Sequence, residues 1–379
     1  DSGVLPYGIA VGGFPNNTTD GVQMYGQARV NFDARTVTEY GTVRAFIEMQ
    51  ATDSDGNTGG NFGLRHAFVQ FGNWTFGKTW STFLHLASSP DYTDAVTVVG
   101  DNFIRRNQIR YTQSFGNGFT MVALEDQNYN APTSLNASGL YSPFASAVND
   151  RTDVPDLVAA INYSGGWGEV QLSGALTQNE FSSYPAVSAP FAAFNDDEIG
   201  YAAQLGLVIN TPFTGEGDAF TLKGIYTDGA SQYTSGGGNG IGRQNVVWGD
   251  CTPLAASFDD CILDSVQTWS VLGSFTHGWT DTISSTIGAS YQNTTADNAA
   301  LYPFMPASLF AGEYEVDAWE VFANVSWTPV ARTTFMIDLH YGELDYNGNL
   351  GFVNVSPFPS PIDEDGEAFL AAFQVTRSF

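Results

Sequence analysis

The residues best suited to chemistry in this 379-residue chain are a basic set and an acidic set that lie close together in the sequence. The basic set occupies the polar positions of early strand-like segments and the start of an irregular segment: Arg29, Arg35, Arg44, Lys78, Arg106 and Arg110. The acidic set, on that irregular segment, is Asp91, Asp94 and Asp101. Facing walls of opposite charge set up a transverse field across a narrow, wet passage. We therefore predict a constriction that contains Arg29, Arg44, Lys78, Arg106, Arg110, Asp91, Asp94 and Asp101; scattered ion pairs on a wet wall are the alternative.

The sequence offers little support for a catalytic nucleophile or a metal site. His85 and His340 have no second His or Cys at metal-ligand spacing. Ser81, His85 and Asp91 have no nucleophile elbow around them. We therefore predict that the chain is not an enzyme and uses no cofactor. The acidic segments 259–260 and 363–367 are candidates for surface-bound divalent cations such as calcium, with a solvated loop as the default.

The acidic set lies on a segment, about 78–106, that lacks clear periodicity and separates two strand-like stretches. A long irregular connection inside a compact domain is usually functional. We predict that it folds into the interior and narrows a passage. Its rings and its histidine are candidate solute contacts: Trp80, Phe83, His85 and Tyr92.

Alternation of apolar and polar residues is the main structural signal. Even positions from Val22 to Ala34 are apolar or small, while the odd positions carry Gln, Arg, Asn and Asp. Alternation over such a length predicts a strand with one apolar face and one polar face. Fifteen segments are expected to be strands: 22–36, 42–52, 61–71, 73–78, 105–114, 118–127, 155–164, 166–179, 198–211, 217–228, 265–277, 281–293, 315–328, 331–343 and 366–379. Segment 4–14 is the candidate for a sixteenth.

The connections alternate in length, with short turns exchanging with long acidic or Gly/Pro-rich loops. Aromatic residues gather near strand ends, as in the girdles of membrane barrels. We therefore predict an all-β fold, a transmembrane antiparallel β-barrel of 16 strands that forms a single domain over residues 1–379. A secreted acidic β-rich binding protein or hydrolase is the competing class.

Composition limits the partners. The formal charge of −27, from 40 acidic and 13 basic residues, excludes a nucleic-acid surface, which needs clustered Lys and Arg. The same excess predicts a mild preference for cations. The two cysteines, Cys251 and Cys261, are close in an extracellular loop of about 229–264 and are expected to form a disulfide, with two free thiols as the alternative.

Several stretches resemble the general diffusion porins of alphaproteobacterial outer membranes. They include FDARTVTEYGTVRAF (32–46), LRHAFVQFGNWTFGK (64–78), VPDLVAAINYSGGWGEVQLSGAL (154–176) and the terminal FQVTRSF (373–379). The resemblance implies a homotrimer of 16-stranded barrels, each with an inward-folded third loop, integral and multi-pass in the outer membrane of a Gram-negative bacterium. It also implies contact with lipopolysaccharide and outer-membrane lipid, and passive diffusion of small hydrophilic solutes and ions. A substrate-specific channel of the same fold is the alternative.

The resemblance also implies that the terminal Phe379 is the signal read by the insertion machinery. Deleting Phe379 is expected to lower the amount of assembled protein in the outer membrane, measured as the heat-modifiable band on gels. Normal assembly of the truncated chain would contradict this role.

Overall fold

The computed structural model describes residues 24–53, 61–94, 96, 98–127, 148–150, 154–183, 194–234, 246–249, 262–300, 311–346 and 366–379. The candidate strand 4–14, the cysteines Cys251 and Cys261, and the acidic pair 259–260 lie outside these residues, as does most of 363–367. Across the described part, no helix is long and apolar enough to cross a membrane.

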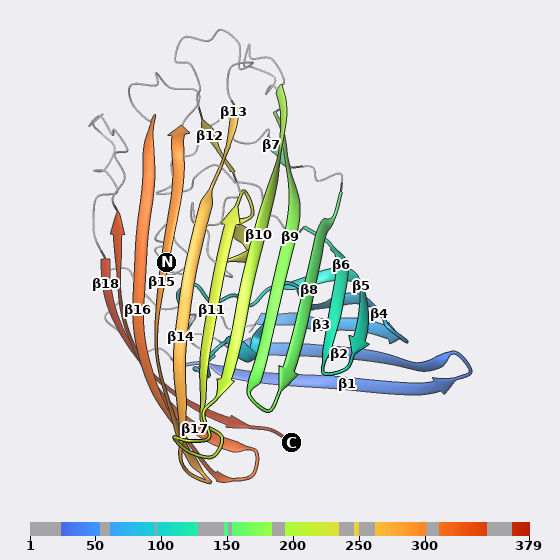
Figure 1. Cartoon of the computed structure of the whole chain (residues 1–379), viewed down its shortest axis with the longest axis vertical. Helices are drawn as coiled ribbons and strands as arrows, with labels where there is room; N and C mark the ends of the chain where they lie inside the picture. The colour runs from blue at the N-terminus through green and yellow to red at the C-terminus, as the bar shows by residue number, and fades with distance from the viewer. Residues whose placement is uncertain are drawn as a thin grey trace.

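One antiparallel sheet makes up the fold, and its strands pair in chain order (Figure 1). Its fifteen consecutive members are β1 Gly26–Thr38, β2 Gly41–Asp53, β3 Asn61–Phe71, β4 Trp74–Trp80, β5 Arg105–Phe115, β6 Gly118–Glu125, β8 Asp156–Gly165, β9 Gly168–Ser183, β10 Phe194–Asn210, β11 Ala219–Asp228, β14 Gln267–Thr280, β15 Ile283–Ala300, β16 Ala311–Val330, β17 Thr333–Tyr346 and β18 Gly366–Arg377. The short β7 Val148–Asp150 pairs with β9, and β12 Val246–Gly249 forms a separate hairpin with β13 Ile262–Ser265.

All fifteen predicted strands are therefore confirmed, and their antiparallel order follows from the hairpin connections. Short turns join β8 to β9 and β16 to β17 at one end of the sheet (Figure 1). Within the described residues, no pairing joins β1 to β18. Closure into a barrel and a sixteenth barrel strand stay predictions.

The strands are longer than the sequence pattern indicated on the side of the long loops. β9 and β10 extend to Ser183 and from Phe194, and β15 and β16 extend to Ala300 and from Ala311. The added residues are mostly polar or small, so they show no alternation, although backbone pairing with the neighbouring strand continues. Alternation of apolar and polar residues reveals a strand only where one face contacts an apolar surrounding and the other a polar one.

Burial is inverted relative to a soluble protein. In β8, Asp156, Val158, Ala160 and Asn162 are buried, while the intervening Leu157, Ala159, Ile161 and Tyr163 are exposed. The same alternation runs along most strands from β9 to β17, with buried polar residues on one face, including Gln171, Gln204, Lys223, Gln292, Glu320 and Asp338. We call this the inner face. The exposed outer face carries large apolar residues, including Leu172, Leu205, Val271, Ile287, Val321, Ile337 and Phe373.

Aromatic residues lie in two rows on the outer face. Toward the long loops, rings of neighbouring strands meet in the pairs Trp269–Tyr291 and Trp319–Tyr341, at 5.0 and 5.6 Å between centroids. Toward the short turns, Trp327 packs on Phe335 at 5.4 Å. Trp319 and Trp327 are eight positions apart on β16, which at about 3.3 Å per residue is about 26 Å along the strand. That spacing matches the scale of the apolar band of a membrane barrel, about 25 Å. A soluble β-rich binding protein would not leave such a band exposed.

The outer face predicts where charge is tolerated. Ile287 pairs with Ala323, midway between Trp319 and Trp327, and is exposed. Ile287→Arg is expected to cost about 2–4 kcal/mol of stability in a bilayer, because the charge must sit in the apolar band.

The control is Ser284→Arg, three residues away on β15, where the alternation places the side chain on the inner face. Unfolding in lipid vesicles by denaturant measures both free energies. Equal losses for the two variants would contradict the assignment of the faces.

Candidate functional site

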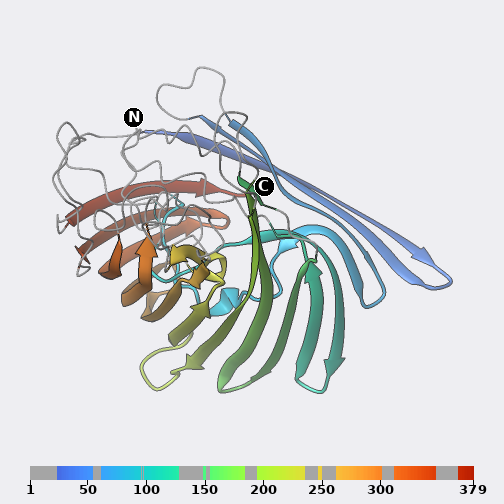
Figure 2. The same cartoon turned by 90° about the horizontal axis from the view of Figure 1, so that it is seen from above.

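The segment between β4 and β5, residues 81–104, crosses the concave side of the sheet (Figure 2). We call it the inner loop; its only helical turn among the described residues is η2, Leu86–Ser88. Many of its residues are buried, including Phe83, Val98, Val99, Asp101 and Asn102. A segment without regular secondary structure needs other partners for its backbone N–H and C=O groups.

Glutamines on the inner face donate to the first part of the inner loop. The Nε2 atom of Gln204 on β10 donates to the carbonyl of Phe83 at 2.8 Å, and that of Gln171 on β9 donates to the carbonyl of Leu84 at 2.9 Å. Both glutamines are buried. A buried amide side chain therefore replaces the backbone partner that a strand would supply.

Carboxylates on the opposite part of the wall accept from the later half of the loop. Asp338 on β17 accepts the backbone N–H of Thr93 at 2.8 Å, and Glu320 on β16 accepts that of Val99, also at 2.8 Å. His340 lies between the two carboxylates and is within 2.5 Å of Glu320 and 2.9 Å of Asp338. The inner loop is thus held from both sides of the curved sheet.

A buried ion pair fixes the loop between these points. Lys223 on β11 and Asp101 on the loop are both essentially inaccessible, and Nζ lies 2.5 Å from Oδ1. Ser89 accepts from the same Nζ at 2.6 Å, and the Tyr92 hydroxyl donates to the other oxygen of Asp101 at 3.1 Å. Burial, with Asp101 beside it, raises the pKa of Tyr92 well above its usual value, which keeps its hydroxyl a donor.

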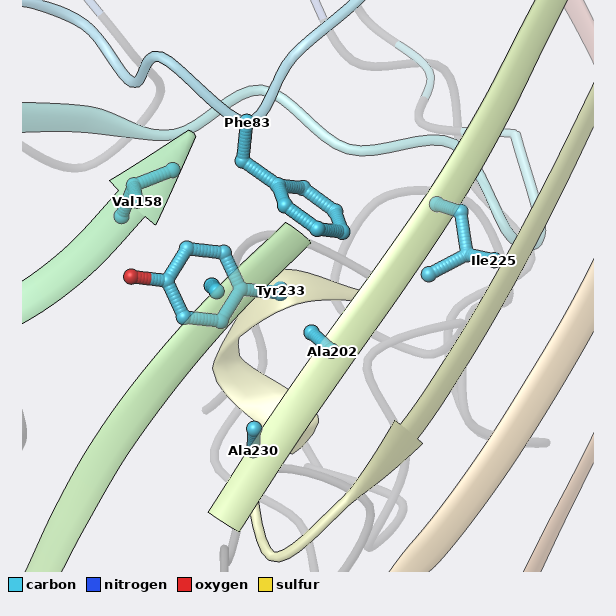
Figure 3. Packing of buried hydrophobic residues seen from close by; sticks show 7 residues of the cluster. Phe83, Val158, Ala202, Ile225, Ala230 and Tyr233 are labelled. Carbon is cyan, nitrogen blue, oxygen red and sulfur yellow. The ribbon is translucent and has the colours of Figure 1, made fainter. Parts of the chain in front are cut away.

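Apolar packing adds to these polar contacts. Phe83 packs in a cluster with Val158, Ala202, Ile225 and Tyr233, and the rings of Phe83 and Tyr233 lie 4.8 Å apart (Figure 3). Tyr233 belongs to η5, Ser231–Tyr233, the turn that follows β11. Phe83 of the inner loop is therefore packed between the sheet and the turn that follows β11.

His85 is also buried in this contact. Its Nε2 atom is 2.9 Å from Glu169, and its ring fills the space above Gly206, where a Cβ atom would lie 2.2 Å from Nδ1. Burial of the ring lowers the pKa of His85, although the hydrogen bond to Glu169 opposes this. The histidine is therefore a neutral packing group at ordinary pH.

On the other side, the loop faces a wall of arginines on the first three strands. Arg29 on β1 pairs with Asp94 on the loop at 2.9 Å, with each side chain more than a third exposed. Arg35 and Arg44 both pair with Asp33, at 2.9 and 3.0 Å. The structure thus brings one predicted basic residue and one predicted acidic residue together across an accessible space.

Two further arginines, Arg65 on β3 and Arg105 on β5, lie near this wall and were not in the predicted set. Arg65 pairs with Glu48 at 2.9 Å and donates to Gln50 at 2.6 Å. Arg105 lies over the Trp80 ring at 3.5 Å. The simple alternation of β3 places Arg65 with the outward-facing Ala67 and Val69, but an irregularity opposite Glu48 and Met49 shifts the register. Counting alternate residues along the sequence does not reveal such a bulge.

Several predicted constriction residues need correction. Asp101 is buried with Lys223 and anchors the loop, so it does not line a passage. Arg106 is also buried, beneath the Tyr233 ring. Arg110 is half-buried, and Lys78 shares by alternation the face of β4 that carries the exposed Trp74 and Phe76. Of the predicted acidic residues, only Asp91 and Asp94 are exposed.

The candidate solute contacts also change. Phe83 and His85 are buried and out of reach of a solute, while Trp80 and Tyr92 are partly exposed. Phe83 therefore cannot line a row of solute contacts with Trp80 and Tyr92, because it belongs to the buried cluster. The candidate nucleophile Ser81 donates to Glu125, and His85 contacts Glu169, so the two do not form a catalytic pair.

Among the residues that the structure describes, no group of three or more His, Cys, Asp or Glu side chains is arranged to hold a metal ion. The acidic stretches proposed for calcium lie mostly beyond those residues, so surface binding of divalent cations stays a prediction.

The buried ion pair makes a direct prediction. Lys223→Gln leaves the Asp101 carboxylate buried without a cation, and breaking a buried pair in this way costs about 3–5 kcal/mol. We expect Lys223→Gln to lower the free energy of unfolding by that amount and to expose the inner loop to protease. The double variant Lys223→Gln/Asp101→Asn should recover much of the loss.

The matched control is Arg35→Gln, which removes a cation from an exposed pair and should leave the free energy of unfolding almost unchanged. If Lys223→Gln behaved like Arg35→Gln, the loop would not depend on the buried pair.

Comparison with known structures shows the same fold elsewhere. The outer membrane channel DcaP of Acinetobacter baumannii superimposes with a TM-score of 0.64 at 18% sequence identity, over 93% of this chain and 84% of that chain. At such low identity, the likeness concerns the fold alone.

Sequence comparison identifies the family. Porin Omp2b of Brucella suis biovar 1 is 29% identical over 146 residues, and Porin Omp2b of Brucella canis is 27% identical over 149 residues. Each alignment covers 35% of this chain and 38% of the relative. The profile of the family described as "Porin subfamily" matches residues 9–364. Because that match spans nearly the whole chain, the protein belongs to the porin family and is an integral β-sheet protein of the outer membrane.

Proposed function

We propose that this porin forms a water-filled channel for the passive diffusion of small hydrophilic solutes and ions. The observation that carries the proposal is the inner loop, which crosses the concave side of a sheet with an apolar outer face. A closed sheet satisfies its backbone groups within lipid, and a loop fixed inside it sets the size of what passes.

The geometry favours a passage beside β1, β2 and the loop. The inner faces of β9 to β17 are buried against the loop, as Gln171, Gln204 and Asp338 show. On β1 and β2, by contrast, the inner-face side chains are more exposed, with Arg29 at 35%, Arg35 at 63% and Arg44 at 28%. Solutes would move along this charged wall and past Asp91 and Asp94.

The preference of the channel for cations or anions depends on the balance of charges along this wall. Arg29 is paired with Asp94, Arg65 with Glu48, and both Arg35 and Arg44 with Asp33. These four arginines share three carboxylates, so they leave about one positive charge on the wall, whereas the chain as a whole carries −27. We therefore propose a mild cation preference that is set by acidic residues at the mouths and on the loop.

We also propose a homotrimer that contacts outer-membrane lipid and lipopolysaccharide. Family membership supports this, as does the apolar outer surface of β1 and β2, where Val30, Phe32 and Ile47 are exposed. The extracellular loop of about 229–264 and its disulfide between Cys251 and Cys261 belong to the same proposal.

The selectivity proposal is tested by reversal potentials across a KCl gradient in planar bilayers. Wild type should prefer K⁺ mildly, and Asp91→Asn/Asp94→Asn should lower the preference, because it removes the two exposed loop carboxylates and frees Arg29. The preference should also fade at high salt, since the Debye length falls from about 8–10 Å to about 3 Å at 1 M.

Asp281→Asn, in the exposed turn between β14 and β15, is the comparison variant: it removes one acidic charge away from the loop and should lower the preference less than the double variant does. Anion preference in wild type would reject the electrostatic assignment, and the absence of any channel current would reject the function.

A further inference from the structure

Three cations of β3, β4 and β5 surround one cavity. The cavity has a volume of about 260 Å³, and its lining includes Arg65, Lys78 and Arg105 together with Gln50 and Thr52. None of its lining residues is a carboxylate. Like charges gathered around a cavity repel one another, and an anion bound between them removes that repulsion.

The fold itself creates the cavity. β3 and β4 are hydrogen-bonded only from the pair Phe71–Trp74 to the pair Ala67–Lys78. Beyond Lys78 the chain soon leaves the sheet for the inner loop, while β3 begins earlier, at Asn61. The end of β3 therefore lies across a gap from the ends of β4 and β5, and the cations line that gap.

Two of the three cations are held in place by contacts with neighbouring protein groups. Arg105 lies over the ring of Trp80 at 3.5 Å, and its Nε atom donates to Nε2 of His66 at 3.2 Å. Arg65 uses Nε for Glu48 and Nη1 for Gln50. Both guanidinium groups are thereby fixed before any ligand arrives, which lowers the entropic cost of binding.

Donors remain for a ligand. Within the described part of the chain, Nζ of Lys78, both Nη atoms of Arg105 and Nη2 of Arg65 form no hydrogen bond to protein. Neither Lys78 nor Arg105 forms an ion pair there, although Arg29, Arg35, Arg44 and Arg65 each do. Planar guanidinium groups and a lysine together are the usual donors for carboxylate and phosphate oxygens.

We propose that this cavity is a binding site for a small anion, a carboxylate or phosphate group, held by Arg65, Lys78 and Arg105. Its volume is below the roughly 300–1,000 Å³ typical of drug-sized pockets, so the anionic group itself would fill much of it. Phe62 and Leu64 at the rim offer an apolar surface to the rest of the ligand.

The bound anion could reach the cavity from either side of the sheet, because the gap borders both faces. Gln50 belongs to the inner face, and its Oε1 atom accepts from Arg29 and Arg65. Phe62 and Leu64 are exposed large apolar residues on the other face. A soluble anion would arrive from the passage, and a lipid phosphate headgroup would arrive from the membrane.

The test compares wild type with Lys78→Gln/Arg105→Gln and with Arg377→Gln. Arg377 lies at the end of β18 and donates to Ala331 and Thr333, so this control removes a positive charge away from the cavity. In the first arm, inorganic phosphate is added to the full-length protein in neutral phosphatidylcholine bilayers, and the reduction of single-channel current is measured. In the second, phosphatidic acid retained by the purified protein is measured by native mass spectrometry.

We expect the double variant to lose at least about tenfold in apparent affinity in one of the two arms. The loss of a hydrogen bond to a charged group is expected to weaken binding by about that factor. Loss in the first arm assigns the site to soluble anions, and loss in the second assigns it to lipid headgroups. The Arg377→Gln variant should match wild type in both. A double variant that equals wild type in both arms, or a wild type that responds in neither, overturns the proposal.

The site does not depend on the proposed function. Open-channel current without phosphate tests the pore, and calorimetric titration of phosphate into detergent-solubilised protein measures the site where no current flows. A heat-modifiable band on gels shows that each variant has folded.

Discussion

The structure depends on polar side chains of the inner face that bond to the backbone of the inner loop. Within 81–104, the described residues have no regular secondary structure apart from the short turn η2, so their N–H and C=O groups need partners elsewhere. Gln171 and Gln204 supply donors, and Glu320 and Asp338 supply acceptors, on strands far apart in the sheet. Because each anchor is buried, losing its partner leaves an unsatisfied group in a medium of low dielectric, which is costly. The loop is therefore part of the wall's own hydrogen-bond network.

This anchoring divides the interior into two parts with different roles. Against β9 to β17, the loop excludes water through the cluster around Phe83 and the buried pair Lys223–Asp101. Against β1 to β3, the loop makes one ion pair among the described residues, Arg29–Asp94, which is partly exposed and contributes little to stability. The buried contacts that stabilise the loop and the accessible charged groups thus lie on opposite sides of it. A substitution on the accessible side should have little effect on stability.

The architecture was predictable because the membrane imposes a strict rule. Each strand must face lipid on one side, so period two appears in sequences as different as those of β1 and β17, and all fifteen strands were found. The site was less predictable, because its contacts join residues distant in sequence. Nothing local marks Lys223 as the partner of Asp101, which is 122 positions away. Arg65 was not in the predicted set, and simple alternation would put it on the outer face, because one bulge in β3 changes the face on which a side chain lies.

Amide hydrogen exchange in the inner loop tests the central claim most directly. The N–H groups of Thr82, Thr93 and Val99 donate to the buried carboxylates of Glu125, Asp338 and Glu320 at 2.6, 2.8 and 2.8 Å. If the wall anchors the loop, these three amides exchange many times more slowly than in an unstructured peptide, at rates similar to those of the neighbouring strands. Exchange of all three at the rate of an unstructured chain in the folded protein would show that the loop is not held, and would contradict the account.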